Sequence, residues 1–154
     1  MKLLFPAVFL GAAALCQNPV TSQNVVSFHL PESIKAKSGA AVTVPLSMHV
    51  NAGFHVNSNR PSDPYFIPLS LSWTAGNLRS PEVVYPKPQL ETLGFSTMPV
   101  SVFTGDFEIV TKFKAGSTTG AASVSGKLHF QACNDTMCLA PKTVNLTLPV
   151  EIVK

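Results

Sequence analysis

The sequence has few charged residues: Asp, Glu, Lys and Arg make up 12% of the chain, against about 25% in typical soluble proteins. The net charge of +3 is spread thinly and forms no basic block. Nucleic-acid-binding domains gather Lys and Arg on one surface or along one helix. We therefore expect no nucleic-acid partner.

Long apolar runs are missing beyond the first segment. No stretch of residues 17–154 approaches the roughly 18 uninterrupted apolar residues of a membrane span. Residues 1–16 differ, because Lys2 is followed by an apolar run from Leu3 to Leu15 that ends among small residues. This pattern is typical of a secretory signal peptide. It predicts an exported protein, in the periplasm or another oxidising compartment where disulfides persist.

The end of the signal peptide leaves two outcomes open. Cleavage after Ala14 fits the small residues at Ala12 and Ala14. Cleavage before Cys16 would instead produce a lipoprotein, although the bulky Leu15 counts against it. Membrane contact would come only through a lipid anchor on Cys16, and only under the second outcome.

Helical periodicity is scarce, and the thirteen prolines exclude a helical protein, because proline removes a backbone donor and clashes inside a helix. After an expected flexible tail at 17–24, short runs of alternating apolar and polar residues recur about every ten residues. These runs are 25–30, 41–50, 65–73, 107–113, 121–130 and 143–152. They predict an all-β fold: an antiparallel immunoglobulin-like β-sandwich, formed by residues 25–154 as a single domain.

Two connections do not follow the strand pattern. Residues 57–64 have the composition of a turn and loop, and residues 85–99 form a long connection broken by prolines. The second connection carries Leu93, Phe95 and Met98, which we expect to be exposed. Long loops in compact domains are usually functional or disordered.

Cysteine is scarce, and only Cys133 and Cys138 lie within the expected domain. Residues 127–132 and 143–152 both alternate as strands and are suited to pair antiparallel. The two cysteines would then lie at the tip of a hairpin. The alternation also places Cys133 on the polar face, where we expect its sulfur to meet solvent.

The cysteine pair allows three interpretations. A structural disulfide would close a ring of about six residues and contribute only roughly 2 kcal/mol, in a domain of about 130 residues that is large enough to fold without it. Exposed disulfides are more often labile and catalytic, which favours redox exchange. A metal site with His129 is disfavoured, because four residues along a strand span about 13 Å whereas zinc ligands lie within about 2.3 Å of the ion. We expect no metal and no cofactor.

Several segments resemble a known family. Phe130-Gln-Ala-Cys133, then Cys138-Leu-Ala-Pro141 and a Leu-Pro-Val strand, are similar to the signature of the amino-terminal periplasmic domain of the thiol:disulfide interchange protein DsbD. Gly53-Phe-His-Val56 and residues 85–96 extend the resemblance, which covers about 45–154. It implies a protein-disulfide reductase type of electron relay with a role in cytochrome c biogenesis. The donor would be a transmembrane thiol reductase or thioredoxin-like protein, and the acceptors periplasmic disulfide-containing proteins.

The resemblance also implies roles for individual residues. Cys138 looks like the thiol that attacks or is attacked by partners, and Cys133 looks like the thiol that resolves the mixed disulfide. Phe95 is the candidate for an aromatic residue that shields the cysteines. His55 and Asn57 stand where the family places aromatic residues near the thiols. Four residues separate the cysteines here, against five in the best-known member of the family.

A non-enzymatic alternative stays open. An immunoglobulin-like module could bind a protein through its loops while the disulfide between Cys133 and Cys138 only locks the hairpin. Replacing both cysteines separates the two hypotheses, because a binding module would keep its partner and a redox module would lose all exchange.

Overall fold

The computed structural model describes residues 20–74, 76–94 and 96–154, and it confirms the predicted all-β class. Strands make up 57% of the structure and helix 3%. The helix is the single turn α1 (Ser22–Val25). Over the described ranges, no helix has the length and apolar character needed to cross a membrane.

The first layer of the sandwich is a four-stranded antiparallel sheet. Its strands, in spatial order, are β1 (Val26–His29), β3 (Ala41–Val50), β9 (Gly105–Ala115) and β6 (Leu78–Val84). In β3, every second side chain, from Val42 to Val50, is buried and the intervening ones are mostly exposed, as expected for a strand with one face in the core. The strand predicted at 41–50 is therefore confirmed.

The second layer contains the predicted hairpin. Its strands, in spatial order, are β2 (Ile34–Lys37), β12 (Lys142–Val153), β10 (Gly120–Phe130) and β5 (Ser70–Trp73). The strands β10 and β12 pair antiparallel from Gly120 opposite Ile152 to Phe130 opposite Lys142. The edge strand β2 pairs with β12 in parallel, the exception to the antiparallel prediction. The strand predicted at 65–73 begins only at Ser70.

One aromatic residue connects the two layers. The Trp73 indole Nε1 donates a hydrogen bond to Thr111 Oγ1 at 3.0 Å, and its ring meets the Phe113 ring edge-on with centroids 5.6 Å apart. Gly126 makes room for the indole, since a Cβ at this position would lie 2.6 Å from the Trp73 ring. These contacts fix β5 and β10 of one layer against β9 of the other.

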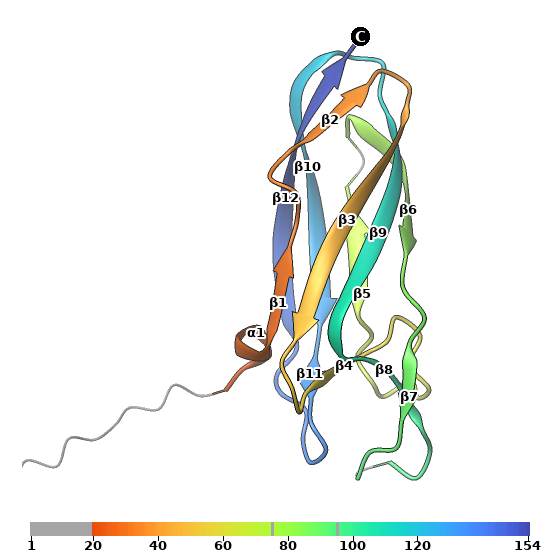
Figure 1. Cartoon of the computed structure of the whole chain (residues 1–154), viewed down its shortest axis with the longest axis vertical. Helices are drawn as coiled ribbons and strands as arrows, with labels where there is room; N and C mark the ends of the chain where they lie inside the picture. The colour runs from red at the N-terminus through yellow and green to blue at the C-terminus, as the bar shows by residue number, and fades with distance from the viewer. Residues whose placement is uncertain (1–19, 75, 95) are drawn as a thin grey trace, which may run out of the picture.

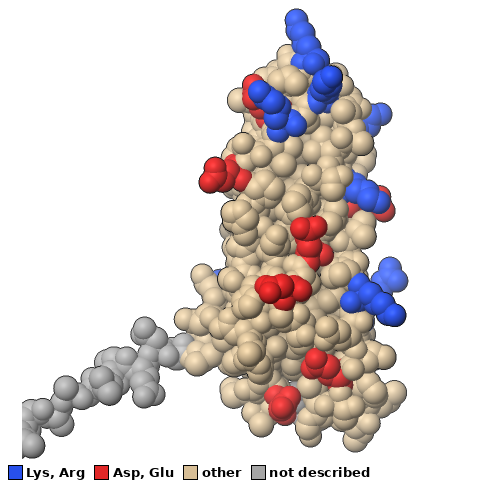
Figure 2. Space-filling view, in the orientation of Figure 1, with Lys and Arg blue, Asp and Glu red and all other residues tan. Residues whose placement is uncertain are grey.

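A third small sheet lies at one end of the sandwich (Figure 1). Its strands, in spatial order, are β11 (Ala132–Cys133), β4 (His55–Asn57), β8 (Val100–Phe103) and β7 (Gln89–Glu91). The strands β11 and β4 follow β10 and β3, while β8 leads into β9, so both layers of the sandwich supply strands. This end sheet, with Cys133 in its edge strand, positions the candidate site. Figure 2 shows Lys and Arg side chains at the opposite end of the molecule, where β2 and the C-terminus lie, and along one side of the sandwich.

Candidate functional site

The two cysteines form a disulfide at the tip of the hairpin. Cys133 and Cys138 are bonded, with their Cα atoms 3.9 Å apart. The turn between them is held by Asn134, whose backbone N–H donates to the Met137 carbonyl at 2.9 Å. The Asn134 Oδ1 accepts hydrogen bonds from the backbone N–H groups of Thr136 at 3.0 Å and Met137 at 2.9 Å. An asparagine that bonds the backbone two residues ahead is a typical turn former. This turn, residues 133–138, is called the cysteine turn below.

The two sulfur-bearing residues differ in exposure. Cys133 is 1% exposed, whereas Cys138 is exposed. The expectation that Cys133 faces solvent is wrong, because the chain leaves β10 after Phe130 and enters β11 of another sheet. This change interrupts the alternation, so that Phe130, Ala132 and Cys133 are all buried. Of the two bonded residues, Cys138 is therefore the one with surface exposed to solvent.

The base of the cysteine turn is anchored by hydrogen bonds. The Leu139 N–H donates to the Ala132 carbonyl at 2.8 Å, and Gln131 Nε2 donates to the Leu139 carbonyl at 2.9 Å. Ser22 Oγ donates to the Ala140 carbonyl at 2.6 Å and accepts from the Ala132 N–H at 3.2 Å. Ser22, which falls within the tail predicted at 17–24, is buried. The contact of Ser22 with the cysteine turn could not be predicted from the neighbouring sequence, because its hydrogen-bond partner Ala140 lies 118 residues away.

His55 lies directly beside the buried cysteine. In the antiparallel pair of β4 and β11, His55 is opposite Cys133, and opposite residues of such a pair point to the same face of the sheet. His55 is 3% exposed, and among the described residues its Nε2 has no hydrogen-bond partner. Burial lowers the pKa of His55 below its ordinary value, and the Asp135 carboxylate offsets part of this effect.

Asn57 has a different role in the structure. It is 1% exposed, and its Nδ2 donates a hydrogen bond to the Ile67 carbonyl at 3.1 Å. Its side chain therefore holds the loop between β4 and β5. Asn57 lies two residues after His55 in β4, and His55 is the residue paired opposite Cys133.

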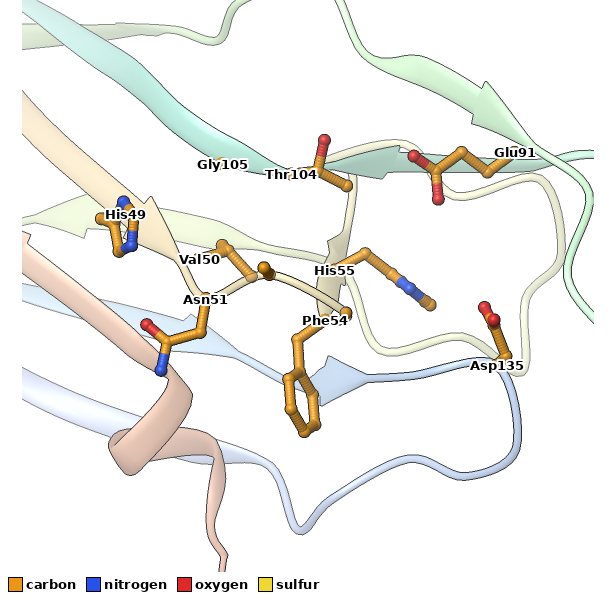
Figure 3. Close-up of a pocket in the computed structure, with 11 residues that line it drawn as sticks. His49, Val50, Asn51, Phe54, His55, Glu91, Thr104, Gly105 and Asp135 are labelled. Atoms are coloured by element: carbon orange, nitrogen blue, oxygen red, sulfur yellow. The ribbon is translucent and has the colours of Figure 1, made fainter.

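An open pocket of about 410 Å³ lies beside the cysteine turn. His55, Glu91 and Asp135 line it together with the connection between β3 and β4. In Figure 3 the His55 imidazole points toward Asp135, and Glu91 lies on the other side of the pocket. The sequence interpretation missed both carboxylates. Asp135 could have been found from its place between the cysteines, but only the position of β7 in the end sheet brings Glu91 to the pocket.

The segment 92–99, which connects β7 to β8, lies against the cysteine turn. Leu93 is 4% exposed and packs with Val100 and Val102, so the expectation that it is exposed is wrong; Met98 is 70% exposed, as expected. A Cβ on Gly94 would lie 3.2 Å from the Asp135 carbonyl oxygen. The backbone of the segment therefore touches the cysteine turn. Phe95, the expected shielding residue, lies outside the described residues.

A metal site would combine His129 with Cys133 and Cys138, which are bonded to each other. His129 Nδ1 lies 2.7 Å from Thr143 Oγ1, across the pair of β10 and β12. In the part of the chain that the structure describes, no three or more His, Cys, Asp and Glu residues are placed to hold a metal ion. The chemistry that the cysteine turn itself offers is that of its disulfide, in which one of the two bonded residues, Cys138, is exposed.

Comparison with known proteins places the chain in a family. The structure is similar to the N-terminal periplasmic domain of ScsB from Proteus mirabilis, with 15% identity and a TM-score of 0.55, over 79% of this chain and 44% of that chain. It is also similar to the reduced Neisseria meningitidis DsbD N-terminal domain, with 14% identity and a TM-score of 0.49, over 84% and 87% of the chains. This chain thus spans less than half of the ScsB chain, and no curated protein matches it. The family model of the N-terminal domain of the thiol:disulfide interchange protein DsbD matches residues 25–149, and the chain belongs to this family.

Proposed function

We propose that this protein is an exported, periplasmic thiol–disulfide exchange module that relays electrons through Cys133 and Cys138. The donor is a transmembrane thiol reductase or a thioredoxin-like protein, and the acceptors are periplasmic proteins with disulfides. The observation that carries the proposal is the disulfide at the hairpin tip, with Cys138 exposed and Cys133 buried. Membership in the DsbD N-terminal family supports it.

The difference in exposure supports a fixed order of attack. A donor thiolate attacks Cys138 Sγ, the bond between the two cysteines breaks, and its electron pair leaves on Cys133 Sγ. A second donor thiol then displaces Cys138 and leaves both cysteines reduced. Toward an acceptor, the Cys138 thiolate attacks the acceptor disulfide, and Cys133 then attacks Cys138 Sγ and releases the reduced acceptor. These steps need no cofactor.

The segment 92–99 is proposed as a cap in which Phe95 shields the disulfide. The contact of Gly94 with the Asp135 carbonyl supports this assignment, because it brings the neighbour of Phe95 onto the cysteine turn. A partner would displace the cap before exchange. In an oxidising compartment, such a cover protects the reduced thiols from small oxidants.

Exposed apolar side chains support a protein partner. Met137, next to Cys138, is 54% exposed, and Met98 of the cap segment is 70% exposed. Flexible methionine side chains adapt to different partner surfaces. A partner that docks over the cysteine turn can bury both of them.

Two measurements test the proposal. Equilibration in glutathione redox buffers should give a midpoint potential above about −300 mV, whereas a midpoint well below it indicates a structural disulfide. The Cys133→Ala variant should trap partners as mixed disulfides on Cys138. The matched Cys138→Ala variant should trap none, and trapping by that variant alone would reverse the two roles.

A further inference from the structure

We propose that His55 is the base that takes the proton from Cys133 when this cysteine resolves a mixed disulfide, and the acid that returns it in the reverse step. The inference rests on the proposed function and assigns a proton carrier to it. Its geometric basis is the antiparallel pairing of β4 and β11, which places His55 opposite Cys133 on one face of the end sheet.

The burial of Cys133 creates the need for such a group. The thiolate is the nucleophile in disulfide exchange, and burial disfavours the charged form of a thiol. Cys133 is 1% exposed, so bulk water has little access to its proton. A neighbouring base can remove the proton as the sulfur attacks.

His55 has the properties of this base. Its side chain is almost fully buried, and within the described part of the chain nothing bonds its Nε2. An unsatisfied buried polar atom destabilises the fold, which favours a role for His55 beyond packing. Burial lowers the pKa of His55 and so favours the neutral imidazole, which is the form that can accept a proton.

The charged groups around His55 suit a transient imidazolium. Asp135 of the cysteine turn and Glu91 of β7 line the same pocket, and the imidazole points toward Asp135 (Figure 3). His49, at the end of β3, also lines the pocket, but its Nδ1 is 2.6 Å from Asp106 Oδ1. The Asp135 carboxylate favours the protonated form of His55, and the pocket gives that proton a way out to solvent.

The proposed step is balanced in atoms and electrons. In the mixed disulfide, Cys138 Sγ is bonded to the sulfur of a partner. His55 accepts the proton of the Cys133 thiol while Cys133 Sγ bonds to Cys138 Sγ. The bond between Cys138 and the partner breaks, and its electron pair leaves on the partner sulfur, which becomes a thiolate. The His55 imidazolium then releases its proton to water or to that thiolate.

The test follows both thiols in one reaction. The full-length protein carrying Cys16→Ser is reduced and mixed in a stopped-flow instrument with one equivalent of dithiobis(nitrobenzoate). Attack by Cys138 releases the first thionitrobenzoate, and attack by Cys133 on the mixed disulfide releases the second in a concentration-independent phase. We expect the second rate to rise with pH through a transition below about 6.5, the ordinary histidine pKa.

The variants separate the inference from the proposed function. His55→Gln should remove this transition and slow the second phase at least about tenfold at neutral pH, with the first phase unchanged. His49→Gln is the matched control and should leave both phases as they are. Asp135→Asn should move the transition to lower pH, because a charge that favours imidazolium is lost.

Each other outcome has a defined meaning. If His55→Gln keeps the transition, or if His49→Gln loses it too, the role of His55 is refuted while the proposed function stands. If His55→Gln does not fold, Asp135→Asn decides, and an unmoved transition refutes the inference. If the unmodified cysteine pair releases no thionitrobenzoate in either phase, the proposed function itself fails.

Discussion

Removal of the disulfide is expected to leave the domain folded. The bond closes a ring from Cys133 to Cys138, and a ring of about six residues contributes roughly 2 kcal/mol through the entropy of the unfolded chain. Replacing the buried Cys133 by Ala also removes a core sulfur, which adds about 1 kcal/mol. Cys138 is exposed, so replacing its side chain adds no further loss of stability. The hydrogen bonds of Leu139 and Gln131 still hold the base of the turn.

The assay is equilibrium unfolding in urea. The double variant Cys133→Ala, Cys138→Ala should lose about 3 kcal/mol against the oxidised protein, with an unchanged far-ultraviolet circular dichroism spectrum. The single variant Cys138→Ser should lose about 2 kcal/mol, because it breaks only the link. A double variant that fails to fold, or that loses more than about 5 kcal/mol, would show that the disulfide is a structural staple and refute the reasoning. Whether the folded double variant still binds its partner decides the binding-module alternative, because a binding module keeps its partner without the cysteines.

Three further predictions concern the surroundings of the site. Burial lowers the pKa of His55 in the folded protein, so below about pH 6.5 the unfolded chain binds a proton at His55 before the folded protein does. The free energy of unfolding should therefore fall as the pH falls. His55→Gln should flatten this part of a plot of the free energy of unfolding in urea against pH. Gly94→Ala should push the cap segment away from the Asp135 carbonyl, 3.2 Å from the added Cβ, and speed reduction of the disulfide by dithiothreitol several-fold; an unchanged rate would argue against a cap. Tyr85→Phe removes the hydroxyl that accepts the Leu71 N–H at 2.7 Å and should cost about 1–2 kcal/mol in urea unfolding.

The parts of the fold that local alternation encodes could be predicted from the sequence. The strand at 41–50 and the long hairpin of β10 and β12 are confirmed, because β3 buries every second side chain and β10 and β12 do so from Val124 and Leu146 onward. The end sheet could not be predicted. Its strands have two to four residues, too few to show a period, and non-local pairing holds them together. The burial of Cys133 and Leu93 depends on this sheet, and both were expected to be exposed.

The candidate site was predictable only in part. Cys133 and Cys138 could be identified as candidate site residues from the sequence, because the predicted domain contains no other thiol. The resemblance to the DsbD family pointed to His55, but its burial and the approach of Asp135 depend on the pairing of β4 with β11. Glu91 and Ser22 reach the site from distant parts of the chain. Local pattern carries no information about such contacts.

The most direct measurement maps where an outside thiol enters the disulfide. The oxidised protein is mixed with excess reduced glutathione, quenched with acid at short times, and digested for peptide mass spectrometry. Entry at the exposed Cys138 predicts a transient glutathione adduct on this residue, followed by release of oxidised glutathione and a fully reduced pair. An adduct on Cys133, or a disulfide that stays intact throughout, would contradict it.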